Sequence, residues 1–231
     1  MREPPSLVGR GPLLAELRAA LDTALAGHGS LVLVTGEPGI GKTALITSLA
    51  GEAAARGVPV GWGRCAEGEG APAFWPWTQV LRATGVLPGG QDHLAPPVPG
   101  STPADTTREA ADRFRIFDLV ARQLAGAAAG SGLLVVLDDL HWADPDSLGL
   151  LEFAARQLAA SRLLLVGSYR QDEAPGRLRR VAATAGAAAV IRLEGLGIAG
   201  VSELMAQITD GPVPTAAATR RRPFSSLHAF G

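Results

Sequence analysis

The residues GEPGIGKT, from Gly36 to Thr43, fit the phosphate-binding pattern G-x-x-x-x-G-K-[ST]. Glycines at 36, 39 and 41 let the backbone bend until successive N–H groups point at one anion. Lys42 could then reach the outer phosphates of a nucleotide, and the Thr43 hydroxyl could ligate Mg²⁺. The alternative is a glycine-rich turn that fits the pattern by chance.

The segments on either side of this loop favour the first interpretation. The apolar run LVLVT (31–35) predicts a buried strand, and KTALITSLAGEAAARG (42–57) predicts a helix. A helix N-terminus adds the positive end of its dipole to a phosphate site. The predicted ligands are therefore the phosphate chain of a nucleotide and Mg²⁺. The predicted binding residues in this loop are Gly36, Glu37, Pro38, Gly39, Ile40, Gly41, Lys42, Thr43 and Ala44.

Two acids, Asp138 and Asp139, follow the apolar run LLVVL (133–137), as in a Walker B strand. Mg²⁺ prefers oxygen ligands and usually holds one carboxylate together with waters and phosphate oxygens. Asp138 is the predicted metal carboxylate, acting through water, and Thr43 is the second predicted metal ligand. Asp139 is predicted to orient the water that attacks the γ-phosphate. The alternative is that the two acids merely begin a loop.

Arg170 ends a further apolar run, RLLLVGSYR (162–170). Its guanidinium could sense or stabilise the γ-phosphate, as arginines in cis do in phosphoryl transfer. Spacing alone leaves a surface arginine equally open. Lys42, Asp139 and Arg170 are the predicted catalytic residues.

Other residues near the paired acids have simpler predicted roles. His141 is predicted to form a hydrogen bond or to pack, in preference to acting as a general base. Trp142 is predicted to be a buried anchor, and residues 144–147 predict the capped start of a helix. Cys65 is predicted to be a small buried residue. No H-x-x-x-H or C-x-x-C spacing in the sequence supports a structural metal site.

The rest of the chain supplies the elements that must position these side chains. Leucines at 13, 14, 17, 21 and 25 predict a helix before the loop, and VPVGWGRC (58–65) predicts a second strand. Helices are also predicted at 78–85, through residues 114–124 and at 146–159, and a last strand at 190–196. Residues 86–106 carry five prolines and predict a mobile loop.

This alternation of short apolar runs and helices predicts an α/β fold. A mainly parallel sheet covered on both faces, a three-layer sandwich, accommodates continuously apolar strands. In such sheets the ligand sits at the carboxyl ends of the strands. Both the phosphate-binding loop and the paired acids lie at strand ends, which agrees with that rule.

Composition narrows the class of protein. The formal net charge of −1 provides no global basic field for nucleic acid. A single cysteine excludes an internal disulfide and suits a reducing compartment. No apolar run approaches the ~20 residues of a membrane helix, and residues 1–10 lack the apolar core of a signal peptide. We therefore expect a cytoplasmic protein without a membrane partner.

Four segments together resemble a known family. LVGR (7–10), GEPGIGKT, LDDLHWAD (137–144) and LLVGSYR (164–170) occur in the order found in AAA-type ATPase domains of the origin-recognition-like group. The sequence is most similar to the STAND ATPase modules of large bacterial LuxR-family transcriptional regulators, over residues 6–210. This resemblance implies a P-loop NTPase fold and a preference for ATP over GTP. It further implies that Val8, Gly9 and Arg10 border the adenine and that Arg170 is a sensor arginine.

The resemblance also implies a domain organisation. Residues 1–12 would be a lead-in, 13–196 the ATPase core, and 197–211 the start of a helical lid. The tail at 212–231 departs from the family pattern. Its basic triplet at 220–222 could contact phosphate, but the lack of helical periodicity favours a truncated or frame-shifted end. No DNA-binding domain is expected in this chain.

Four functions are compatible with these features. In the first, a regulatory switch binds Mg-ATP and hydrolyses it slowly, and the γ-phosphate engages Arg170. The second is a self-sufficient oligomeric AAA ATPase, and the third is a truncated remnant that binds nucleotide weakly or not at all. A phosphoryl transferase has less support, because no acceptor-binding signature is present. The expected partners are ATP or ADP and a regulatory protein or small-molecule effector, and an oligomer is open.

Overall fold

Short apolar runs form the strands of one parallel sheet. The computed structural model describes residues 9–68, 70–87, 94, 103–183 and 188–195. Within these ranges the sheet has five strands in the order β2-β3-β4-β1-β5, and every neighbouring pair is parallel. The strands are β1 Ser30–Gly36, β2 Val60–Arg64, β3 Leu133–Asp138, β4 Leu163–Tyr169 and β5 Ala188–Leu193.

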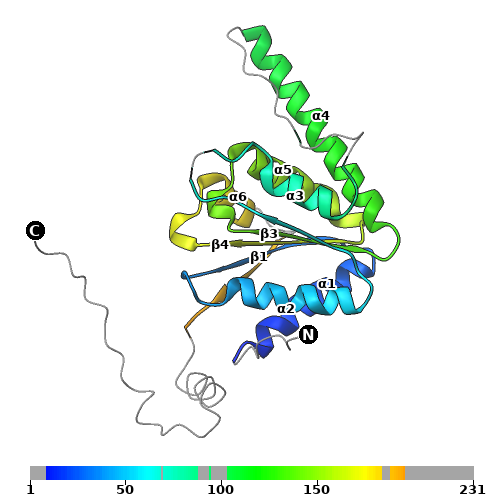
Figure 1. Ribbon diagram of the computed structural model, residues 1–231, viewed down its shortest axis with the longest axis vertical. Coiled ribbons are helices and arrows are strands. Elements are labelled where there is room, and N and C mark those ends of the chain that lie inside the picture. The colour runs from blue at the N-terminus through cyan, green and yellow to red at the C-terminus, as the bar shows by residue number, and fades with distance from the viewer. Residues whose placement is uncertain (1–8, 69, 88–93, 95–102, 184–187, 196–231) are drawn as a thin grey trace, which may run out of the picture.

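Helices cover both faces of the sheet (Figure 1). One face packs against α1 Gly11–Leu25 and α2 Lys42–Ala55. The other face packs against α3 Trp75–Ala83, α4 Pro103–Ala128, α5 Pro145–Gln157 and α6 Gly176–Ala183. Alternate residues of β1 pack on opposite faces of the sheet. Val32 and Val34 pack on the face covered by α1 and α2, and Leu31 and Leu33 pack on the other face. The predicted α/β three-layer sandwich is confirmed.

Several predicted boundaries differ from the structure. α1 begins at Gly11 instead of Leu13, and β5 begins at Ala188 instead of Val190. The predicted loop at 86–106 is wrong at its end, because α4 already begins at Pro103. The sequence reading also missed α6, whose only buried side chains are Leu178 and Val181.

Parts of the predicted organisation lie outside the described residues. These are Val8, the lid segment 197–211 and the tail 212–231. Among the described helices, none is long and apolar enough to cross a membrane.

α3 lies unusually close to the edge strand β2. A Cβ on Gly63 would overlap the backbone of Pro76 in the first turn of α3, so only glycine permits this approach. Trp77 is fully buried and donates from Nε1 to the carbonyl oxygen of Ser147 at 3.0 Å. This bond ties α3 to α5, and the predicted cap of α5 is observed because Asp144 accepts from the N–H groups of Asp146 and Ser147. α3 is thereby fixed beside the carboxyl end of β2.

Candidate functional site

The loop after β1 turns into α2 through glycines in the left-handed region. Gly39 has φ 72° and Gly41 has φ 102°, conformations that strain residues with a side chain. Gly41 is also the N-cap of α2, so the first N–H groups of this helix have no intrahelical partner. The loop therefore presents free donors and the positive end of a helix dipole to the same space.

The side chain of Lys42 contacts the backbone of this loop. Its Nζ donates hydrogen bonds to the carbonyl oxygens of Gly36 and Glu37, both at 2.9 Å. Burial is the main cause that lowers the pKa of the Lys42 ammonium; Asp139 opposes this shift, and Arg170 adds to it. Lys42 is also the only lysine in the chain. Oxygens of a bound phosphate could replace these two carbonyl oxygens as hydrogen-bond acceptors of the Lys42 ammonium.

The single lysine allows its titration to be followed with an acylating label. The lowered pKa raises the neutral, nucleophilic fraction of the amine at a given pH. The midpoint of the pH profile for acetylation of Lys42 is therefore expected to lie lower in the folded protein than in the same chain in denaturant. Mass spectrometry of the labelled peptide measures both profiles, and the N-terminal amine is the internal control. A folded-state midpoint at or above the unfolded one would contradict this expectation.

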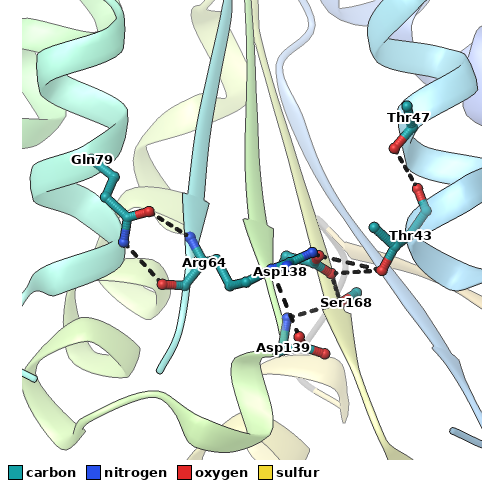
Figure 2. A network of polar contacts seen from close by, with 7 residues as sticks. All are labelled: Thr43, Thr47, Arg64, Gln79, Asp138, Asp139 and Ser168. Carbon is teal, nitrogen blue, oxygen red and sulfur yellow. Dashed lines mark hydrogen bonds and ion pairs between the residues drawn. The ribbon is translucent and has the colours of Figure 1, made fainter. Parts of the chain in front are cut away.

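Asp138 is the buried centre of a polar network at the carboxyl end of β3 (Figure 2). Ser168 Oγ donates to its Oδ1 at 2.5 Å, and Arg64 Nη2 donates to its Oδ2 at 2.8 Å. Thr43 Oγ1 lies 3.3 Å from Oδ2 and 3.4 Å from Oδ1. The structure thus brings together the two predicted metal ligands, Thr43 and Asp138.

Asp139 differs from its neighbour in both exposure and backbone. Its φ of 60° lies in the left-handed region, and its N–H donates to Ser168 Oγ at 2.9 Å. One third of its side chain is exposed, whereas Asp138 is fully buried. The change of backbone direction therefore separates the two carboxylates, one held inside the sheet and one open to solvent.

Arg170 follows β4 and lines a cavity together with residues of the phosphate-binding loop. This cavity has a volume of about 400 Å³ and is lined by residues 35–38, 40, 170–173 and 192–195. Arg170 Nη1 donates to Glu173 Oε1 at 3.0 Å. The guanidinium therefore lines the space beside the loop while bound to a carboxylate of its own segment. An anion in the cavity would compete with Glu173 for it.

The segment before α1 also approaches the phosphate-binding loop. Arg10 Nη2 donates to the carbonyl oxygen of Ile40 at 3.2 Å, and Gly9 turns the chain with φ 67°. Two of the three residues predicted to border the adenine therefore belong to a segment that contacts this loop.

The sequence matches the family described as AAA ATPase domain over residues 6–166. The chain belongs to this family. The matched range contains the phosphate-binding loop and both acids, and it ends before Arg170. Membership places the chain among nucleotide-binding ATPase domains, which usually act with Mg²⁺. No curated protein matches the sequence at a significant level.

Solved structures share the fold of this AAA ATPase domain. Cdc6p from Pyrobaculum aerophilum matches with TM-score 0.57 and 19% identity, over 91% of this chain and 52% of its own. A signal transduction ATPase with numerous domains (STAND), carrying a tetratricopeptide repeat sensor, from Pyrococcus horikoshii matches with TM-score 0.56 and 16% identity, over 94% and 28%. ORC1 from Aeropyrum pernix, solved in complex with DNA, matches with TM-score 0.54 and 18% identity, over 91% and 52%. This domain therefore spans about half or less of those chains.

The oxygen ligands at the start of α2 and at the end of β3 in this AAA ATPase domain fit a magnesium ion. The Thr43 hydroxyl and the Asp138 carboxylate are hard oxygen donors of the kind that Mg²⁺ prefers. Because the Thr43 hydroxyl can donate its hydrogen to Asp138, its lone pairs stay available to a metal. A bound Mg²⁺ would neutralise charge on the phosphates of the nucleotide.

Three neighbouring residues test the simpler sequence predictions. His141 packs in the interior, with Nε2 3.7 Å from Glu173 Oε2, and burial lowers the pKa of its imidazole. Cys65 is buried as predicted, and burial raises the pKa of its thiol to about 12. The prediction that Trp142 is a buried anchor is wrong, because Trp142 is 38% exposed. In the short 3₁₀ turn η2 Leu140–Trp142, the first two side chains face inward and the third faces out.

Sequence reasoning missed three residues of the polar network: Arg64, Gln79 and Ser168. Each contacts Asp138 or holds a residue that does. For Arg64 and Ser168 a signal was present, because polar residues lie at the ends of three strands that are adjacent in the sheet, β2, β3 and β4, whereas Gln79 lies on α3. Only the strand order, which the sequence does not reveal, shows that these ends meet.

Proposed function

We propose that this domain binds Mg-ATP and hydrolyses it slowly as a regulatory switch in a signal-transducing ATPase, as part of or derived from a transcriptional regulator. The observation that carries the proposal is that Arg170 and the loop line the same cavity. The arginine has an internal partner in Glu173 and an alternative one in a γ-phosphate. Only ATP would supply that alternative, so ATP and ADP would favour different arrangements of the segment after β4.

Each residue of the site then has a distinct role. The loop donors and Lys42 bind the phosphate chain, and Thr43 with Asp138 holds Mg²⁺. Asp139, the partly exposed acid, orients the attacking water, and Arg170 stabilises charge on the γ-phosphate. The nearby Gly9 and Arg10, together with Val8, border the adenine. These assignments require small displacements of Lys42 from Gly36 and Glu37 and of Arg170 from Glu173.

The regulatory part of the proposal draws on similarity as well as geometry. The segments LDDLHWAD and LLVGSYR resemble STAND modules, and the fold is shared with a signal transduction ATPase that carries a sensor. We take residues 13–196 as the ATPase core and 197–211 as the start of a lid that would respond to the nucleotide. The effector would be a protein or a small molecule acting in the cytoplasm, and assembly into an oligomer is compatible with the family.

ATP affinity and turnover together test this function. Isothermal titration is expected to give a dissociation constant in the micromolar range, about −8 kcal/mol. Turnover is expected at about 10⁻³ to 10⁻² s⁻¹, the range of nucleotide switches without an activating partner. Turnover near the ~10 s⁻¹ of ordinary enzymes would instead support a self-sufficient ATPase. Absence of binding at millimolar ATP would overturn the proposal and favour a domain that does not bind nucleotide.

A further inference from the structure

Arg64 ends the edge strand β2 and directs its guanidinium at both acids (Figure 2). Nη2 lies 2.8 Å from Asp138 Oδ2, and Nε lies 4.0 Å from Asp139 Oδ2. The strand register places Arg64 directly beside Asp138. The two side chains of this ion pair differ in exposure: 57% of the Arg64 side chain is exposed, and the Asp138 side chain is fully buried.

The backbone of Arg64 is fixed on the side away from β3. Gln79 of α3 accepts a hydrogen bond from Arg64 N at 3.3 Å and donates one to Arg64 O at 2.9 Å. This side chain replaces a neighbouring strand at the sheet edge. Because Gly63 lets α3 approach, the clamp is part of the packing of this face. The guanidinium can therefore move while the end of β2 stays in place.

The three side chains that cover Asp138 differ in their freedom to leave. Ser168 is fully buried and also accepts from the N–H of Asp139, so it is tied to both acids. Thr43 is itself a proposed metal ligand and stays at the site. Of these three, Arg64 is the one whose side chain is mostly in solvent. A metal ion, or a water bound to it, that approaches Asp138 Oδ2 therefore displaces Arg64.

We propose that Arg64 is an exchangeable counter-ion of the magnesium site, an inference that rests on the proposed function. Without metal, its guanidinium compensates the buried carboxylate of Asp138, which would otherwise be an unpaired internal charge. When Mg²⁺ enters with the nucleotide, two cations compete for one carboxylate and repel each other, and Arg64 turns outward. Arg64 thus stabilises the metal-free domain and lowers its affinity for Mg²⁺.

Arg64→Met tests both halves of this exchange, because it removes the charge and keeps an unbranched side chain. In EDTA, the variant is expected to unfold about 5 °C below the wild type in calorimetry. The Mg²⁺ concentration that half-saturates ADP binding, measured by isothermal titration, is expected to fall about fivefold. Arg64→Lys retains the charge without the planar fork, and both readouts are expected to lie between those of Arg64→Met and the wild type.

Arg56→Met is the matched control. Arg56 is 45% exposed and pairs at 2.7 Å with Asp22, whose side chain is 60% exposed, so no buried carboxylate depends on it. Its loss is expected to lower the unfolding temperature by less than about 2 °C and to leave the Mg²⁺ dependence unchanged. If wild-type ADP binding shows no Mg²⁺ dependence, the proposed function fails and the exchange fails with it. If wild-type binding needs Mg²⁺ and Arg64→Met leaves the half-saturation unchanged or raises it, only the exchange is overturned.

Discussion

Lys42→Ala is expected to weaken ATP binding by about a hundredfold or more, the scale of a lost, desolvated charge-assisted contact. The wild-type ammonium is buried at the loop, where it donates hydrogen bonds to two backbone carbonyl oxygens that phosphate oxygens can replace. Alanine removes this charge and favours the helix in which it lies. Isothermal titration with ATP measures the loss, and circular dichroism checks that the variant is folded.

Two comparisons show whether the effect comes from phosphate recognition. Adenosine lacks phosphates, so its affinity should be the same for Lys42→Ala and the wild type. Arg18→Ala removes a positive charge from α1, where Arg18 pairs with Glu52 of α2, and should leave ATP affinity unchanged. A folded Lys42→Ala protein with wild-type ATP affinity would show that the loop does not bind phosphate as proposed.

The central strands of the sheet could be predicted because their apolar sequence matches their complete burial. β3 and β4 lie in the interior of the sheet with helices on both faces, and every one of their residues is buried. Such strands need continuous apolar runs, which is the pattern that the sequence carries. The turn between β1 and α2 was also predictable, since the glycines at 39 and 41 take the left-handed backbone that the motif requires.

Features that depend on distant contacts were not predictable from local patterns. Arg64 looks like an ordinary polar residue at a strand end until the register places it beside Asp138. α6 buries only Leu178 and Val181. Two apolar residues three positions apart are too few to distinguish a helix from a loop by their spacing. The prediction that Trp142 is buried was wrong for a related reason: the direction of its side chain depends on a turn of three residues and not on its hydrophobicity.

Asp139→Asn is expected to leave ATP affinity within about twofold of the wild type and to lower hydrolysis about a hundredfold, a typical contribution of a residue that positions or deprotonates a nucleophile. The amide keeps the size of the carboxylate but loses its charge and proton affinity. Asparagine is the informative replacement because it tolerates the left-handed backbone at this position, φ 60°, whereas alanine would add strain. Single-turnover hydrolysis and nucleotide titration measure the two quantities separately.

A control with the same chemical change distinguishes catalysis from overall charge. Asp118 on α4 has 34% of its side chain exposed, against 33% for Asp139, and pairs with Arg122 on the same helix. Asp118→Asn should therefore affect neither binding nor hydrolysis. If Asp139→Asn weakens Mg²⁺-dependent binding instead of hydrolysis, Asp139 belongs to the metal site and the proposed division of labour between the two acids is wrong. That division rests on burial: the enclosed carboxylate of Asp138 can hold an ion, and the open one of Asp139 can reach a water.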